Sequence, residues 1–279
     1  MIQPLLRDNS FLSDVIGAES SPDRFTLWWL GQSGFLLRRK RTHVLLDPYL
    51  SDSLTRKYAA TDKPHVRMTE LVISPEKLDF IDIISSSHNH TDHLDAETLG
   101  PLIRSNPSAR LVIPEANRAF VADRLKIDPA VPLGVDDGLS VSVDDVQFTG
   151  IAASHDAIER DEAGRCKCLG YVIAFGRWRI YHSGDTLLYD GMVERLRPFK
   201  VDVALLPING RAPERRVPGN LDGVEAARLA KEIEARLVIP HHYEMFEFNT
   251  ASPREFAAEC ERIGQPFRVL RCGERISVT

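Results

Sequence analysis

The chain has 279 residues, of which 43% are hydrophobic and 27% charged, values typical of a globular protein that builds a large core. Its net charge is −5, whereas proteins that follow a nucleic-acid backbone usually carry a basic excess, so nucleic acid is not an expected partner. No apolar run approaches the roughly 18 residues that a membrane span needs, and Arg7, Asp8 and Asp14 interrupt the region where a signal peptide would be apolar. We therefore expect a cytoplasmic protein without a membrane anchor.

The first part of the chain predicts closely spaced strands. Four runs rich in apolar, β-branched and aromatic residues are strand-like: Phe25–Leu30, Phe35–Leu37, His43–Leu46 and Ile81–Ile84. The short glycine-containing segment Gly31–Gly34 separates the first two and is typical of a tight turn.

The rest of the chain alternates between strands and helices. Further strand-like runs are Leu111–Ile113, Val146–Ile151, Tyr171–Phe175, Trp178–Tyr181, Val201–Leu206 and Leu237–Ile239. Helical periodicity is found in Ala96–Arg104, Leu187–Leu196, Leu221–Glu234 and Pro253–Ile263. The pattern predicts an α/β fold with mixed sheets covered by helices, and because no linker-like segment interrupts it, residues 1–279 are expected to form a single domain.

The most informative motif directly follows the strand-like run that ends at Ile84. The segment 85–95 reads SSSHNHTDHLD and places His88, His90, Asp92 and His93 within six positions. Histidine is the commonest metal ligand, and alternate residues of an extended segment point the same way, so His88 and His90 can hold one ion. Asp92 and His93 lie beyond the turn and can face a second, neighbouring ion. The alternative, a histidine-rich polar loop that caps a helix, is disfavoured by this spacing.

One such cluster cannot complete two coordination shells, because catalytic zinc typically takes three protein ligands and one open position. Candidates for the missing ligands stand at the ends of later strands: His155, Asp185 and the pair His241 and His242. Function concentrates at such strand-to-loop junctions in α/β folds. Adjacent side chains diverge, so only one member of the histidine pair is expected to face an ion.

The histidines not yet assigned and the four cysteines are of residue types that bind metals in other proteins, but here they are interpreted as mainly structural. His43 and His65 have no potential ligands around them in the sequence, and His182 is either a core histidine or a partner of a metal ligand. The four cysteines show no disulfide spacing. Cys166 and Cys168 could chelate a soft metal, but two thiols alone rarely make a site, so all four are expected to be reduced structural thiols. No glycine pattern predicts a nucleotide cofactor.

These motifs together resemble the metallo-β-lactamase superfamily, and within it the L-ascorbate-6-phosphate lactonase-like branch. The matching segments are LWWLGQSG at 27–34, Leu46-Asp47-Pro48, the His-x-His-x-Asp-His run, 181–186 and 239–246. The resemblance implies an αββα sandwich with the site at the shared edge of two sheets. It also implies that His88, His90 and His155 hold the first of two divalent ions, zinc or manganese. Asp92, His93 and His242 would hold the second, and Asp185 would bridge both.

The expected activity is hydrolysis, because two neighbouring divalent ions activate water at neutral pH. Asp92, close to that water, is expected to take and return a proton, and Asp185 to act with it as the bridging carboxylate. The favoured substrate is a lactone or carboxylic ester of a small anionic sugar derivative. A metal-dependent phosphodiesterase and a metal-binding protein without turnover are the alternatives, and a homo-oligomer is possible.

Substrate binding is expected at the loop after the strand-like run 201–206. Asn209 and Arg211 stand nearest the strand end, and Arg215 and Arg216 follow. Arginine presents a planar fork that binds phosphate or carboxylate in bidentate fashion, so Arg211 is the predicted anion clamp. The alternative is a solvated loop whose arginines touch no substrate.

Overall fold

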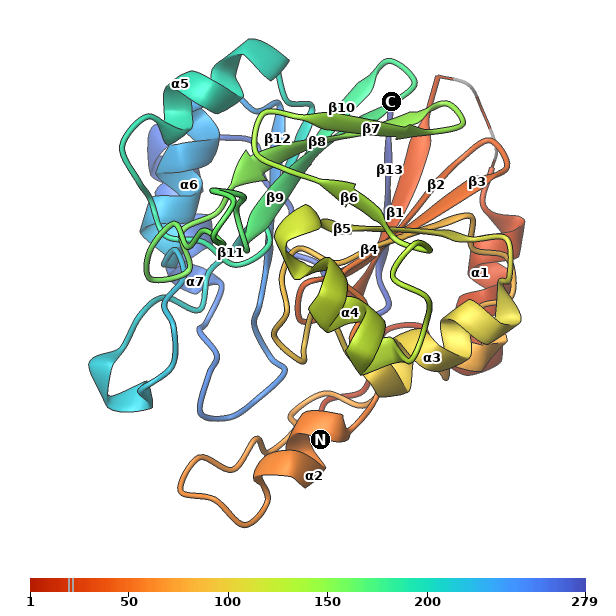
Figure 1. The fold of residues 1–279 in the computed structure, drawn as a ribbon. Helices are drawn as coiled ribbons and strands as arrows, with labels where there is room; N and C mark the ends of the chain where they lie inside the picture. The colour runs from red at the N-terminus through yellow and green to blue at the C-terminus, as the bar shows by residue number, and fades with distance from the viewer. Residues whose placement is uncertain (20, 22) are drawn as a thin grey trace.

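The computed structural model describes residues 1–19, 21 and 23–279. These residues form two β-sheets with helices packed outside them (Figure 1). The predicted αββα sandwich of two mixed sheets is therefore confirmed.

The first sheet has the strand order β13-β1-β2-β3-β4-β5-β6. Its strands are β1 (Phe25–Gly31), β2 (Gly34–Arg39), β3 (Thr42–Leu46), β4 (Ile83–Ser85), β5 (Arg110–Pro114), β6 (Leu133–Val135) and β13 (Arg275–Val278). Neighbours from β13 to β3 run antiparallel, whereas β3 to β6 run parallel. The carboxyl ends of β3, β4 and β5 consequently lie at one edge of the sheet.

The second sheet has the order β12-β11-β10-β9-β8-β7. Its strands are β7 (Ser140–Val143), β8 (Val146–Ala152), β9 (Leu169–Phe175), β10 (Trp178–His182), β11 (Val203–Pro207) and β12 (Leu237–His241). The pairs among β10, β11 and β12 are parallel, and those among β7 to β10 are antiparallel. Both sheets are mixed, as the alternation of short turns and helical connections predicts.

Helices cover the outer faces of the two sheets. In Figure 1, α1, α3 and α4 lie beside the first sheet, and α5, α6 and α7 lie beside the second. The helices are α1 (Asp8–Gly17), α2 (Ser53–Tyr58), α3 (Ala96–Ser105), α4 (Arg118–Leu125), α5 (Met192–Leu196), α6 (Gly223–Glu232) and α7 (Arg254–Ile263). Short 3-10 turns are η1 (Pro75–Lys77), η2 (Glu115–Asn117), η3 (Arg197–Phe199) and η4 (Pro213–Arg215). Within the described ranges, none of these helices has the length and apolar character to cross a bilayer.

The core lies between the sheets and beneath the helices. Every residue of β1 is buried, because this strand is covered on both faces. Trp28, Trp29 and Trp178 are almost fully buried there. Each large apolar side chain removed from water contributes roughly 1.5–3 kcal/mol, so this packing gives the loops at the sheet edges a rigid base.

The structure adds α1, α2, α4, β6, β7 and β13 to the predicted elements, and it shortens one predicted helix. The predicted helix Leu187–Leu196 is restricted to α5, because Gly191 adopts a φ of +86° immediately before its first residue. An L-residue rarely adopts this conformation, and a helix cannot pass through it.

One excursion between β3 and β4 stands off from the body of the fold. Figure 1 shows α2 and its flanking loops projecting from the two sheets. A separate small hydrophobic cluster stabilises it, formed by Tyr49, Leu54, Met245 and Phe246, with Tyr58 and Phe248 packed against it. The excursion therefore forms a wall beside the loop that follows β12.

Candidate metal centre

The seven predicted ligands come from loops that follow four strands. His88, His90, Asp92 and His93 follow β4, and the others follow β8, β10 and β12. Parallel strands end at the same edge of their sheet, so these loops converge. The structure thus brings together all seven residues that the sequence singles out.

Their potential donor atoms form three overlapping groups within which all atoms lie within 4.8 Å of one another. The groups are His88, His90 and His155; His88, His93 and Asp185; and Asp92, His93 and His242. The first and third groups match the two triads that the resemblance implies. Whether each triad holds an ion stays a prediction.

Asp185 lies between the two triads. Its Oδ1 is 3.3 Å from His93 Nε2, and its Oδ2 is 3.3 Å from His242 Nε2 and 3.7 Å from His155 Nε2. One carboxylate thus approaches histidines of both triads. This is the placement that a bridging ligand requires.

The chemistry of the donor set fits divalent ions. The atoms His88 Nε2, His93 Nε2 and Asp185 Oδ1 are buried, and none makes a hydrogen bond among the described residues, although the last two lie 3.3 Å apart as an ion pair. Leaving such a polar atom buried and unpaired costs about 1–3 kcal/mol. A bound ion would explain three such atoms in one cluster. Imidazole and carboxylate groups together suit zinc, manganese or iron.

Neighbouring side chains orient the ligands. Asp47, at the end of β3, accepts a hydrogen bond from His93 Nδ1 at 2.6 Å, and both side chains are fully buried. Asp47 also accepts bonds from the Ser87 backbone N–H and hydroxyl. His155 Nδ1 donates to Gly219 O at 2.9 Å, which leaves its Nε2 free for an ion. Such contacts fix the tautomer and ring orientation of a ligating histidine.

Gln32 is a further contact of the ligands that sequence reasoning did not identify as part of the site. The β1–β2 turn gives it a φ of +49° and full burial. Its Nε2 donates to Asp92 Oδ2 at 2.7 Å and lies 3.0 Å from His242 Nε2. Gln32 and Asp47 both lie in segments that carry the family resemblance. That resemblance was the sequence signal that could have identified them as part of the site.

The charges of the cluster are strongly coupled. Burial acts to lower the pKa of His93 and His242, but Asp185 and Asp92 outweigh it and raise both pKa values, that of His242 to about 9. Burial likewise acts to raise the pKa of Asp185, but the same two histidines hold it well below its ordinary value. Divalent ions therefore compete with protons for these side chains.

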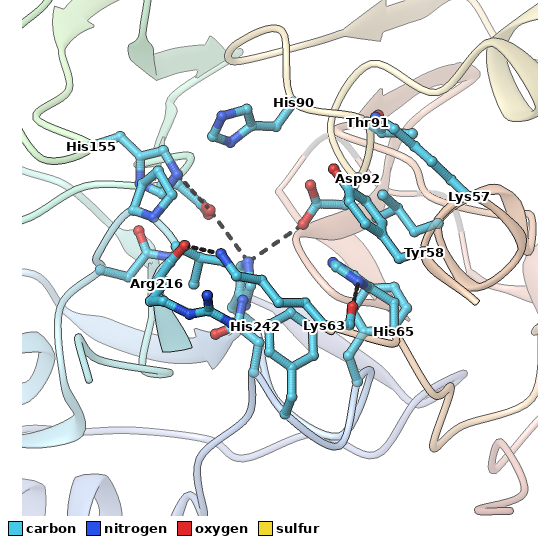
Figure 2. Close-up of a pocket in the computed structure, with 18 of the residues that line it drawn as sticks. Lys57, Tyr58, Lys63, His65, His90, Thr91, Asp92, His155, Arg216 and His242 are labelled. Carbon is cyan, nitrogen blue, oxygen red and sulfur yellow. Dashed lines mark hydrogen bonds and ion pairs between the residues drawn. The ribbon is translucent and has the colours of Figure 1, made fainter. Parts of the chain in front are cut away.

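Five of the seven ligands line a cavity of about 330 Å³: His90, Asp92, His155, Asp185 and His242. Figure 2 shows His90, Asp92, His155 and His242 facing this cavity, with Lys63 and Arg216 at its edge. Four cationic side chains line it: Lys57, Lys63, Arg124 and Arg216. Arg124 also donates to the Asn89 and Leu94 carbonyls, which flank the segment from His90 to His93.

The two predicted substrate residues are placed elsewhere. Arg211 forms a two-pronged ion pair with Glu225, at 2.7 and 2.8 Å, and does not line the cavity, so the structure contradicts its predicted position at the site. The reason is local, since Glu225 belongs to the capping box of α6 and faces this loop. Asn209 is buried and does not line the cavity itself, but it bonds to Asn220 and Asn249, which do.

The four histidines that are not proposed as ligands lie in different surroundings. His182 and His241 are fully buried, stack on each other at 5.3 Å and bond to Ser33, so they support the core beneath the site. His43 packs edge-on against Phe80. His65, interpreted from the sequence as structural, instead lines the cavity.

Comparison with known protein families gives a match over most of the chain. A family model described as "Beta-lactamase superfamily domain" matches residues 42–243. The chain is also similar to a UPF0173 metal-dependent hydrolase of Opitutus terrae, with 31% identity over 258 residues that cover 90% of this chain and 99% of the relative.

Solved structures show the same fold. Igni18, a metallo hydrolase from the archaeon Ignicoccus hospitalis, superposes with a TM-score of 0.67 at 22% identity, covering 92% of this chain and 99% of its own. An isothiocyanate hydrolase from Delia radicum gut bacteria gives a TM-score of 0.72 at 19% identity, covering 91% and 99%. At these identities the likeness concerns the fold alone.

Proposed function

Because this chain belongs to the metallo-β-lactamase superfamily and to its family of UPF0173 metal-dependent hydrolases, we propose that it is a dinuclear hydrolase of small anionic esters or lactones. The observation that carries the proposal is the cluster of buried, unpartnered donor atoms shared by two triads and a central carboxylate. One ion needs three or four protein ligands, so seven converging ligands favour two ions.

Zinc or manganese ions bound by these residues would polarise a substrate oxygen and activate a water molecule at neutral pH. We infer that Asp92 takes and returns the proton. Its Oδ2 is held by Gln32, so Oδ1 is the atom left to take a proton and return it to the leaving group. Gln32, Asp47 and Gly219 bond to the ligands and do not line the cavity, so their proposed role is to position the ligands.

The anionic character of the proposed substrate is supported by the charges around the cavity. Lys57, Lys63 and Arg124 line it without a carboxylate partner among the described residues, whereas Arg216 pairs with Asp62. Among the described residues its acidic lining consists of Asp92 and Asp185, both proposed ligands. Divalent ions would neutralise the charges of Asp92 and Asp185. The remaining basic side chains would then give the cavity a net positive charge, which attracts anions. A cavity of about 330 Å³ lies at the small end of ligand pockets and suits a small molecule.

The test is a hydrolysis panel on the metal-loaded protein, with lactones, carboxylic esters and phosphodiesters compared before and after chelation. The proposal expects chelator-sensitive cleavage of lactones or esters. Phosphodiester cleavage alone would contradict it, and the absence of hydrolysis in all three classes would favour a binding role.

We further propose that Lys63, at the cavity edge, contacts the anionic group of the substrate, and Lys63→Met tests this contact separately. This change should raise KM for a phosphorylated gluconolactone several-fold more than for gluconolactone, because uniform binding of the charge is lost. Arg211→Met is the matched control, since it removes a cation of the same region that lies outside the cavity. An equal response of both substrates to Lys63→Met would refute the contact.

A further inference from the structure

His65 occupies a distinctive position in the cavity wall. It follows α2 on the excursion between β3 and β4, away from the strand ends that carry the ligands. Figure 2 shows its ring between Tyr58 and Lys63, on the side of the cavity where Asp92 lies. It is not part of any of the three groups that can hold an ion.

The imidazole of His65 is fixed on all but one side. Tyr58 stacks on it with a centroid distance of 4.2 Å and an interplanar angle of 20°. Phe248 and Phe246 pack edge-on against it at 4.4 and 5.2 Å. The backbone is held as well, because Thr55 Oγ1 donates to His65 O at 2.7 Å. The ring therefore has little freedom to turn.

One of the two ring nitrogens is already bonded. His65 Nδ1 lies 2.9 Å from Lys63 O. A carbonyl oxygen only accepts, so Nδ1 carries the hydrogen and Nε2 of the neutral ring presents a lone pair. Burial lowers the pKa of His65, which favours this neutral form near pH 7. Among the described residues, the hydrogen bond of the His65 ring is made by Nδ1, and Nε2 has no partner.

We propose that His65 is a specificity-determining residue whose Nε2 accepts a hydrogen bond from a hydroxyl or N–H group of the substrate. The inference rests on the proposed function in that it places the substrate in the metal-lined cavity. It narrows the substrate class to small anions that carry a hydrogen-bond donor in addition to the bond that is cleaved. A fixed acceptor discriminates strongly, because an analogue without the donor leaves it desolvated and unpaired.

The test measures binding rather than turnover. Inositol monophosphate carries a hydroxyl on each of its other ring carbons, whereas cyclohexyl phosphate has the same ring and charge but no hydroxyl. The Kd of each probe is measured by calorimetry on the metal-loaded wild type and on His65→Phe, which keeps the aromatic packing and removes both nitrogens. His43→Phe is the matched control at a histidine outside the cavity.

We expect His65→Phe to weaken inositol monophosphate about tenfold or more, and to change cyclohexyl phosphate less than twofold. His65→Asn can keep the donor toward Lys63 O but lacks the distal acceptor, so it should behave like His65→Phe. His65→Gln can place a carbonyl near the Nε2 position and should recover part of the affinity. His43→Phe should leave both probes unchanged.

Equal weakening of the two probes would overturn the inference, as would unchanged binding of inositol monophosphate or its failure to bind the wild type. The test of His65 and the hydrolysis test of the proposed function can fail independently of each other. Probe discrimination through His65 without any chelator-sensitive hydrolysis would refute the hydrolase proposal alone. Hydrolysis without such discrimination would refute the role of His65 alone.

Discussion

Asp47→Asn tests how the protein holds the second triad. In the wild type, Asp47 Oδ2 accepts from His93 Nδ1 at 2.6 Å with both side chains fully buried. The change removes the charge but keeps the size and the acceptor for the Ser87 backbone N–H. It adds no backbone strain, because Asp47 has a φ of +38° and asparagine tolerates this region.

The expected magnitude follows from the bond that is lost. A hydrogen bond to a charged group contributes about 1.5–3 kcal/mol. At about 1.4 kcal/mol per factor of ten, this corresponds to roughly 10–100-fold weaker metal binding, the range found when partners of ligating histidines are removed. The loss should fall mainly on the ion held by His93, with the triad of His88, His90 and His155 less affected.

The assay is competition with a chromophoric chelator, which resolves two dissociation constants when two ions bind. Asp145→Asn is the matched control, because it removes a half-exposed carboxylate that pairs with Arg39 away from the centre. If Asp47→Asn leaves both dissociation constants unchanged, or weakens both triads equally, the orienting role of Asp47 is refuted.

Three further predictions concern the bridge, the turn beneath it and a surface network. Asp185→Asn should weaken both ions, whereas His155→Ala should weaken mainly one; equal metal loss from the two variants in elemental analysis would contradict the bridging position. Gly184→Ala should lower Tm by about 2–8 °C in calorimetry, because φ is +58° there and an added Cβ would approach Ser87 Cβ to 2.6 Å; an unchanged Tm would show that the turn relaxes. Bonds from two arginines lower the pKa of Glu259 to about 2, so its stabilisation is present above the unfolded pKa near 4.5 and is lost as pH falls toward 2. The Tm of Glu259→Gln should accordingly lie below that of the wild type at pH 7, and the difference should narrow at low pH; a constant difference would refute this linkage.

Much of the fold was predictable because its strands are buried on both faces and read as continuous apolar runs. β1, β9 and β11 are of this kind. β7 and β13 were not predicted, because they are short, polar at alternate positions and partly exposed. Their pairing depends on the neighbouring strand rather than on their own sequence.

The ligands were predictable for a different reason. His88, His155, Asp185 and His242 each follow a strand, so the strand prediction alone indicates that they converge. His65 could not be identified in this way. Its position depends on an excursion that is held by a separate cluster and by buried Arg67, which bonds to Ser51 and Thr69.

Arg211 shows the opposite limit. A cation near a strand end predicts an anion site only when no local carboxylate neutralises it. Glu225 is fourteen residues away in sequence, and its role as both helix cap and ion-pair partner becomes visible only when the loop is folded against α6.

The central claim is that one chain holds two divalent ions between two triads joined by Asp185. Its most direct test is the metal stoichiometry of the protein after removal of all metal and reconstitution with zinc or manganese, measured by elemental analysis together with native mass spectrometry. Two ions per chain, with Asp185→Asn impairing both, are the predicted result. A maximum of one ion per chain at saturating metal would contradict the account.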